Sequence, residues 1–167
     1  SGKKYGENKD VLMSMRVIVD HIRTASMIMA DDSGVAPSNV DQGYVVRKLI
    51  RRVIRHGKKL GIENNFCVEM AQRVVEIFAD VYPEVKRNEE FVLREMKNEE
   101  NKFRQTLEQG IKEFEKLLKG FEMAFEKTNK KITKISGKQA FKLYDTYGFP
   151  LEMTQELASE NSLTVDE

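Results

Sequence analysis

The densest group of chemically useful side chains is a run of cations in the first third of the chain. Residues 43–59 read GYVVRKLIRRVIRHGKK, with seven Lys or Arg and no acid, although the whole chain holds 28 basic and 27 acidic residues. At 100° per residue, the seven cations fall within an arc of about 140° on one side of a helix, with apolar residues opposite. The cations of this basic arc are Arg47, Lys48, Arg51, Arg52, Arg55, Lys58 and Lys59.

A cationic arc of this kind is suited to a polyanion. Like charges four residues apart repel each other by a few tenths of a kcal/mol, and a solvated helix face usually relieves this repulsion with interspersed acids. No acid lies between Asp41 and Glu63, and arginines outnumber lysines, as bidentate phosphate binding favours. We predict that the arc binds the phosphates of a nucleic acid. A solvated face and an acidic partner helix are the alternatives.

Three helices are predicted to position this arc, and together they form a body over residues 10–82. Apolar residues recur every three or four positions in each helix. Turn-forming residues gather in DDSGVAPSN, and Ser38 or Asn39 is expected to cap the basic helix. Pro83 is expected to end the third helix. The predicted helices span residues 11–30, 40–60 and 65–82, after a chain start and linker over 1–9.

The rest of the chain is predicted to hold a long charged helix and a shorter helical part. Residues 84–130 contain no proline, and their apolar residues follow a near-heptad spacing. In the C-terminal part, 131–167, Ser136 and Gln139 match a capping box that begins a helix ending in YDTYGFP. The predicted fold class is all-α: a one-domain helical bundle with one long charged helix and at most a short strand or hairpin near 131–136.

Composition narrows the class of protein. The single Cys67 excludes an internal disulfide, and no apolar run approaches the roughly 20 residues of a membrane span. These features predict a cytoplasmic location in a reducing compartment, with no membrane partner. His21, His56 and Cys67 show no metal-ligand spacing, so no metal site is predicted. The sequence has no initiator Met and ends without a closing signal, so we expect a piece of a longer chain.

Two stretches resemble one family of enzymes. Residues 14–57, SMRVIVDHIRTASMIMADDSGVAPSNVDQGYVVRKLIRRVIRHG, resemble the region just after the catalytic domain in alanyl-tRNA synthetases. Residues 135–157, ISGKQAFKLYDTYGFPLEMTQEL, resemble a second signature of the same region, and the resemblance as a whole covers residues 5–62 and 132–165. The resemblance implies a class II ligase that attaches alanine to its tRNA using ATP. It assigns this segment to gripping the acceptor stem, which members of the family identify by a G·U wobble pair.

The resemblance gives the base-reading role to Asp145, and Asn39, whose amide can both donate and accept, is the second candidate. A wobble G leaves its exocyclic amine free in the readable minor groove of an A-form stem, and a carboxylate can accept from it. Asp145 lies in the last turn of a predicted helix, where an acid opposes the macrodipole at a cost of about 0.3–1 kcal/mol and calls for compensation. The alternatives are a surface Asp145 near a Lys or Arg, and an Asn39 that only caps its helix; capping and base reading are compatible.

The sequence also departs from the family. Gln42 stands where the family has an arginine, which puts one phosphate contact in doubt. We find neither the arginine motifs that bind ATP in class II synthetases nor the His/Cys cluster of the family's editing domain. We therefore expect no catalytic residue and no cofactor in this segment. ATP, magnesium and zinc are expected in the enzyme's catalytic and editing domains, which are its predicted partners together with the tRNA for alanine.

Two other functions fit parts of the pattern. A helical protein-interaction module would use the long helix as a coiled-coil arm, would dimerise and would show no RNA affinity. A DNA binder resembling helix-turn-helix proteins would place the basic helix in the major groove. Against it, the cations form a lengthwise stripe with no interleaved Asn, Gln or Ser to read bases. A gel shift that compares duplex DNA with the tRNA separates the three functions.

Overall fold

The structure is mostly helical. The computed structural model describes residues 1–129 and 131–166 of the 167. The predicted all-α class is confirmed, because strands occupy only two short segments of the described residues. The elements in chain order are α1 (Lys9–Ala30), α2 (Asp41–Lys59), α3 (Cys67–Phe78), α4 (Pro83–Arg87), α5 (Glu89–Thr128), β1 (Lys134–Ile135), α6 (Gly137–Tyr147), α7 (Leu151–Glu160) and β2 (Thr164–Val165).

The chain divides into two compact units, Ser1–Lys102 and Phe103–Glu167. The division falls inside α5, whereas the sequence predicted one domain with boundaries at the ends of the long helix. The physical reason lies in the side chains of α5. Near Glu99 they bond to α2, and near Glu113 they bond to α6. The first part of α5 packs in one unit and the rest in the other. The apolar spacing along the helix does not show where this change occurs.

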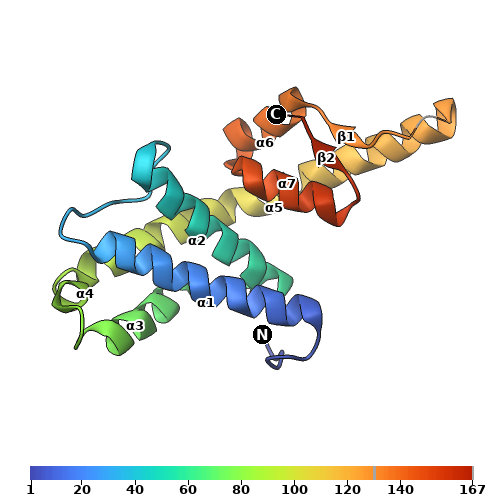
Figure 1. Ribbon diagram of the computed structural model, residues 1–167. Helices are drawn as coiled ribbons and strands as arrows, with labels where there is room; N and C mark the ends of the chain where they lie inside the picture. The colour runs from blue at the N-terminus through green and yellow to red at the C-terminus, as the bar shows by residue number, and fades with distance from the viewer. Residues whose placement is uncertain (130, 167) are drawn as a thin grey trace. The chain divides into compact units, whose positions relative to one another are not determined.

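Helices α1 and α2 lie side by side in the first unit (Figure 1). Each presents an apolar stripe to the other, as the spacing predicted. The stripes include the fully buried Ile22, Met29, Ile50 and Ile54. Burial of a side chain of this size contributes about 1.5–3 kcal/mol. The paired stripes therefore fix the position of α2, which carries the basic arc.

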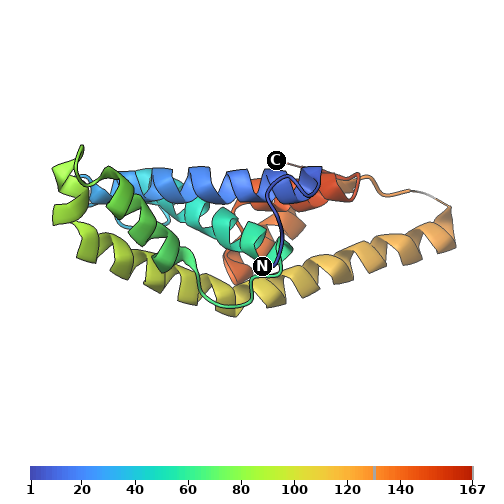
Figure 2. The same cartoon turned by 90° about the horizontal axis from the view of Figure 1, so that it is seen from below.

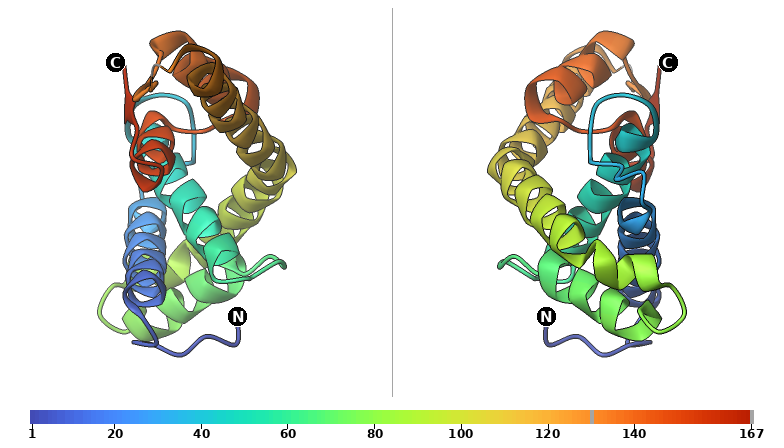
Figure 3. Two further views of the ribbon diagram at one scale, coloured as in Figure 1. Left: turned by 90° about the vertical axis from the view of Figure 1, so that its right-hand side faces the viewer. Right: turned by 90° about the vertical axis from the view of Figure 1, so that its left-hand side faces the viewer.

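Helix α3 completes the three-helix body, and Figure 3 shows it beside α1 and α2. Its N-cap residue, Phe66, provides no side-chain cap. The carboxylate of Glu100 on α5 accepts instead from the backbone N–H groups of Phe66 and Cys67, both at 3.0 Å. A carboxylate at this position satisfies otherwise unpaired N–H groups and interacts favourably with the positive end of the helix dipole. Glu100 thereby ties α5 to the beginning of α3.

A short helix, α4, precedes α5, so the long helix predicted over 84–130 has an interruption near its start (Figure 2). The third helix of the body ends at Phe78, before the expected stop. Pro83 lies in the first turn of α4, where its missing N–H is not needed. Asn88 separates α4 from α5, and its side-chain amide donates to the carbonyl oxygen of Ala30 at 2.9 Å. From Glu89 to Thr128, α5 is continuous.

In the second unit, α6 has the boundaries that its sequence predicts. Ser136 and Gln139 form a complete capping box at the N-terminus, and Gly148 ends the helix in the left-handed conformation at φ 65°. Phe149 then turns back into the unit and is fully buried. Its ring lies 5.9 Å from the ring of Phe103 on α5, centroid to centroid, and fills the space beside Gly110. This contact fixes the C-terminal end of α6 against α5.

The predicted strand near 131–136 is present as β1, but it does not form a hairpin. It pairs in parallel with β2, with Lys134 opposite Thr164 and Ile135 opposite Val165. An ion pair between Lys134 Nζ and Asp166 Oδ1, at 2.6 Å, adds to the contact. The sequence did not predict β2, because a two-residue strand is too short to show alternation. The pairing brings the chain back beside the beginning of α6.

The helices in the described ranges, 1–129 and 131–166, lack a segment that is both long enough and apolar enough to cross a membrane.

Candidate nucleic-acid interface

The basic arc lies on α2, but its cations differ widely in exposure. Lys59 is exposed, and Lys48 and Lys58 are half-buried. The Arg55 residue is only 3% exposed, so its guanidinium belongs to the interior of the unit. The uniform surface arc expected from the helical geometry is therefore wrong for Arg55. The helix turns this part of the arc toward the protein, which the spacing alone could not show.

Glu99 of α5 neutralises the middle of the arc. The Nε of Arg51 donates to Oε1 of Glu99 at 2.6 Å, and the Nε of Arg47 lies 3.5 Å from the same oxygen. The side chains of Arg47, Arg51 and Glu99 are 18%, 12% and 3% exposed. The helix itself offers no acid to relieve the repulsion, as the sequence showed, and the relief comes from Glu99 on another helix. An acidic partner helix, one of the alternatives from the sequence, is present in the same chain.

The remaining cations of the arc also have local contacts. Nη1 of Arg52 lies 3.0 Å from Nε2 of His21 on α1, and a guanidinium can only donate, so this nitrogen of His21 accepts. The Nζ of Lys48 lies 5.7 Å from the centroid of the Tyr44 ring, a cation–π distance. These contacts orient side chains that are half-buried.

Asn39 is exposed on the loop before α2, and it does not cap the helix. The N-cap is Val40, and no side chain caps it. The Oγ of Ser38 accepts from the N–H of Val40 at 3.2 Å and donates to the carbonyl of Val40 at 2.8 Å, so Ser38 stabilises the turn before the helix. The side-chain oxygen of Asn39 accepts a hydrogen bond from Nη1 of Arg47. The structure thus removes capping as the explanation for Asn39.

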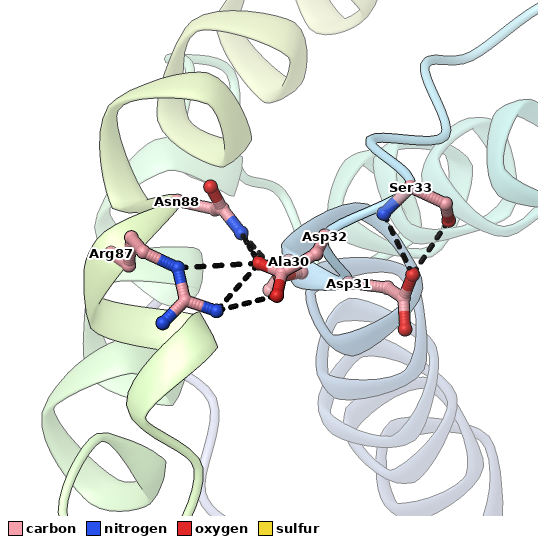
Figure 4. Close-up of polar contacts among 6 residues, drawn as sticks. All are labelled: Ala30, Asp31, Asp32, Ser33, Arg87 and Asn88. Atoms are coloured by element: carbon pink, nitrogen blue, oxygen red, sulfur yellow. Dashed lines mark hydrogen bonds and ion pairs between the residues drawn. The ribbon is translucent and has the colours of Figure 1, made fainter.

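The other end of this loop is held to the end of α4 and to Asn88, which follows it (Figure 4). Nη2 of Arg87 donates to both carboxylate oxygens of Asp32, at 2.6 Å each, and Nδ2 of Asn88 donates to Oδ1 at 2.9 Å. The bonds from Arg87 and Asn88 hold the pKa of Asp32 below its ordinary value. The same loop begins with Asp31, whose pKa is lowered by bonds from the hydroxyl and the N–H of Ser33. Both carboxylates are therefore charged and fixed at neutral pH.

Asp145 is exposed in the last turn of α6, as predicted. Among residues 1–129 and 131–166, no side chain forms a hydrogen bond or ion pair with its carboxylate. The nearby cation Lys142 is paired elsewhere: its Nζ lies 2.7 Å from Oε1 of Glu113, and this bond lowers the pKa of Glu113 and raises that of Lys142. The alternative of an Asp145 paired with a surface cation is therefore not found in the described structure.

Two aromatic rings lie next to Asp145 on the surface of α6. Phe141 is 64% exposed and Tyr144 is 37% exposed, with their ring centroids 6.4 Å apart. Exposing a large apolar side chain to water costs free energy, and exposed aromatic rings are suited to stacking on bases. The sequence analysis did not select Phe141, although its position four residues before Asp145 places both on one face of the helix.

Asn39 belongs to the first unit and Asp145 to the second, so each is characterised within its own unit. Glu99 is the functional candidate that sequence reasoning missed. It is one of many acids on a charged helix, and only its contacts with α2 distinguish it. Within the described ranges, no group of three or more His, Cys, Asp or Glu side chains is arranged to hold a metal ion.

Comparison with known proteins identifies the family. The sequence model of the family described as tRNA synthetases class II (A) matches residues 1–167. The chain is 46% identical to an alanine–tRNA ligase of Treponema pallidum over 99% of its own length and 26% of that relative. It is 47% identical to the alanine–tRNA ligase of Trichodesmium erythraeum over 92% of this chain and 17% of that relative. A third alanine–tRNA ligase, from Bacillus pumilus, is 42% identical over 99% of this chain and 18% of the relative.

The chain thus spans about a quarter, or less, of the length of these relatives. The resemblance seen in residues 5–62 and 132–165 is confirmed, and it extends across the long charged helix, which the sequence motifs did not cover. Because the family model matches every part of it, the chain belongs to the class II tRNA synthetases, in the group that includes the alanine–tRNA ligases.

Proposed function

We propose that the protein attaches alanine to its tRNA using ATP, and that this segment recognises the acceptor stem of that tRNA. The match of the family model over the whole chain, together with alanine–tRNA ligases as relatives, carries the proposal. In this proposal, ATP and metal ions are bound by other parts of the enzyme. The present segment contributes binding and selection.

The phosphates of the stem are bound by the cations of the arc that reach the surface. Arg55 is buried, and the side chains of Arg47 and Arg51 are only 18% and 12% exposed, so we assign the phosphate contacts to the other members. Such contacts fix the position of the RNA without reading its sequence. Four phosphate contacts predict a slope of about −3 for log affinity against log salt concentration, at 0.7–0.9 per phosphate. The assigned cations are Lys48, Arg52, Lys58 and Lys59.

The base pair is read by Asp145 and Asn39. An ionised carboxylate only accepts hydrogen bonds, and the free amine of a wobble G is a donor in the minor groove. The exposed Asp145, which has no ion-pair partner in residues 1–129 or 131–166, is available for that bond. The amide of Asn39 provides both donors and an acceptor, and it lies on the loop that leads into the basic helix.

The test compares an acceptor-stem hairpin that carries the G·U pair with one that carries G·C. The unaltered protein should prefer G·U by about 1–3 kcal/mol, the range of one good base contact. Asp145→Asn should lose most of this preference while keeping the salt slope, and Asn39→Ala should lose part of it. Asp80→Asn is the matched control, since it removes one exposed carboxylate from an unrelated surface.

Equal binding of the two hairpins would move the test to the full-length enzyme. There the charging of G·U and G·C tRNA is compared for the same variants. If Asp145→Asn and Asn39→Ala both charge the two tRNAs in the ratio of the unaltered enzyme, the assignment of the reading residues is wrong. If the protein dimerises and binds no RNA at all, the interaction-module alternative replaces the proposal.

A further inference from the structure

We propose that Glu99 is a positioning residue for base recognition: acting through Arg47, it fixes the side-chain amide of Asn39 so that its NH₂ group is the one offered to the RNA. This inference rests on the proposed function. It adds Glu99 to the residues needed for base recognition, although Glu99 does not touch RNA and lies 60 positions further along the chain than Asn39.

The relay consists of three side chains from three elements. Glu99 on α5 is 3% exposed, and its Oε1 lies 3.5 Å from Nε of Arg47 on α2. Nη1 of the same guanidinium donates to Oδ1 of Asn39, on the loop before α2. One planar guanidinium is thus ion-paired with a buried carboxylate on one side and hydrogen-bonded to the exposed amide on the other. Since the guanidinium is rigid, fixing one side fixes the other.

The direction of the amide follows from hydrogen-bond chemistry. Arg47 has only donors, so the atom of Asn39 that meets it must be the carbonyl oxygen. Its oxygen is thereby occupied, and the NH₂ group is the end that remains for RNA. A donor fits the acceptors that every base pair presents in the minor groove. Asn39 then supplies a donor where Asp145 supplies an acceptor, and the two residues have complementary roles.

The buried carboxylate is what keeps Arg47 in this position. Arg47 and Arg51 are four residues apart on one helix and repel each other unless an acid intervenes. Glu99 contacts both of them, at 3.5 and 2.6 Å. Without its charge, two largely buried guanidiniums lose their counter-ion, and Arg47 gains free energy by turning toward solvent or a phosphate. Asn39 would then lose the donor that sets its orientation.

The adjacent Glu100 provides a matched control. It is also buried, at 0% exposure, and also on α5, but it caps α3 and has no contact with Arg47. Glu99→Gln and Glu100→Gln therefore remove the same charge from neighbouring positions of one helix. Both are expected to lower the midpoint of thermal unfolding. Only Glu99→Gln should change the selection between base pairs.

The experiment measures kcat/KM for charging of G·U and G·C tRNA by the full-length enzyme. We expect Glu99→Gln to lower the ratio of the two values by about fivefold, the loss of part of one base contact. Glu100→Gln should leave the ratio within about twofold of the unaltered enzyme. In an Asn39→Ala background, Glu99→Gln should not lower the ratio further, since its effect passes through Asn39. A purely structural role would not produce this dependence.

Arg47→Lys is the second variant, in case Glu99→Gln does not fold. A lysine keeps the charge beside Glu99 but lacks the planar guanidinium that reaches Glu99 and Asn39 together, so the same loss of ratio is expected. The inference is overturned if both Glu99→Gln and Arg47→Lys keep the ratio, or if their effects are equally large with and without Asn39. An unaltered enzyme with no preference for G·U would contradict the proposed function itself, and the inference with it.

Discussion

Asn39 and Asp145 have the same proposed task but are placed in different ways. Asn39 lies on a loop, and its side chain is held by Arg47, which in turn contacts Glu99 from a distant part of the chain. Asp145 lies on a helix, and no side chain in the described structure holds its carboxylate. One side chain is oriented by tertiary contacts, and the other by the backbone that carries it.

This difference determines what a mutation elsewhere can do. The orientation of Asn39 depends on remote residues, so changes in α5 should alter it without unfolding the loop. The position of Asp145 depends on whether α6 forms and where its end is anchored. The capping box of Ser136 and Gln139 and the left-handed Gly148 define the two ends of α6, and the buried Phe149 anchors the helix. The position of Asp145 should therefore change when α6 is destabilised. The orientation of the Asn39 side chain should change when a single hydrogen bond or ion pair is lost.

The largest effect is expected from Phe149→Ala. The ring is fully buried, and truncation of a buried Phe to Ala costs about 3–5 kcal/mol. Hydrogen exchange measures the outcome: the amides of α6 should lose protection, while those of α2 in the first unit should lose much less. Phe141→Ala is the control on the same helix region, because its ring is 64% exposed and its removal should change stability by no more than about 0.5 kcal/mol.

Equal loss of protection in α2 and α6 would show that the two units unfold together. The position of Asp145 would then depend on the stability of the whole chain, and the contrast with Asn39 would disappear.

A second, smaller effect distinguishes two glycines of α5. A Cβ at Gly110 would lie 2.2 Å from the ring of Phe149, whereas a Cβ at Gly120 would meet nothing within 4 Å. Gly110→Ala should therefore destabilise the protein by about 1–3 kcal/mol, as overpacking does. Gly120→Ala should stabilise it by about 0.5–1 kcal/mol, because alanine is the better helix former. Chemical denaturation measures both, and stabilisation by Gly110→Ala would mean that Phe149 does not pack there.

The same contrast explains what the sequence could predict. Ser136 and Gln139 lie three residues apart, so their capping box was visible, as was the exposed acid near the end of α6. The apolar stripes of α1 and α2 were visible for the same reason. The role of Glu99 could not be predicted, since it depends on a contact between residues 48 positions apart. The burial of Arg55 could not be predicted either, because it depends on how α2 is rotated. Local spacing predicts elements; it does not predict which charges meet.

A third prediction compares the residues before α6 and α2. Ser136→Ala removes a side-chain cap that is present, and it should cost about 1 kcal/mol of stability. Asn39→Ala removes no cap, because Val40 is the N-cap of α2, so its cost should stay within about 0.5 kcal/mol. Thermal unfolding followed by circular dichroism measures the pair. A loss for Asn39→Ala as large as that for Ser136→Ala would restore capping as the role of Asn39.

The smallest effect concerns the loop that carries Asn39, and it depends on pH. Bonds from Arg87 and Asn88 lower the pKa of Asp32 in the folded protein below the ordinary value of the unfolded chain. A lowered pKa means that the carboxylate contributes stability in full above the ordinary value of about 3.9, and that this contribution is lost as the pH falls through the folded pKa. Near neutral pH the loop should therefore be insensitive to small pH changes.

Carboxyl carbon chemical shifts measured by NMR during an acid titration test this. In Arg87→Gln, the midpoint for Asp32 should rise toward the ordinary value, since its largest stabilising bond is gone. The neighbouring Asp31 is the internal control, because Ser33 lowers its pKa and Arg87 does not contribute. Its midpoint should stay unchanged in the variant. If instead both midpoints rise together, the loop has opened as a whole, and Arg87 holds the entire segment before Asn39 through this one ion pair.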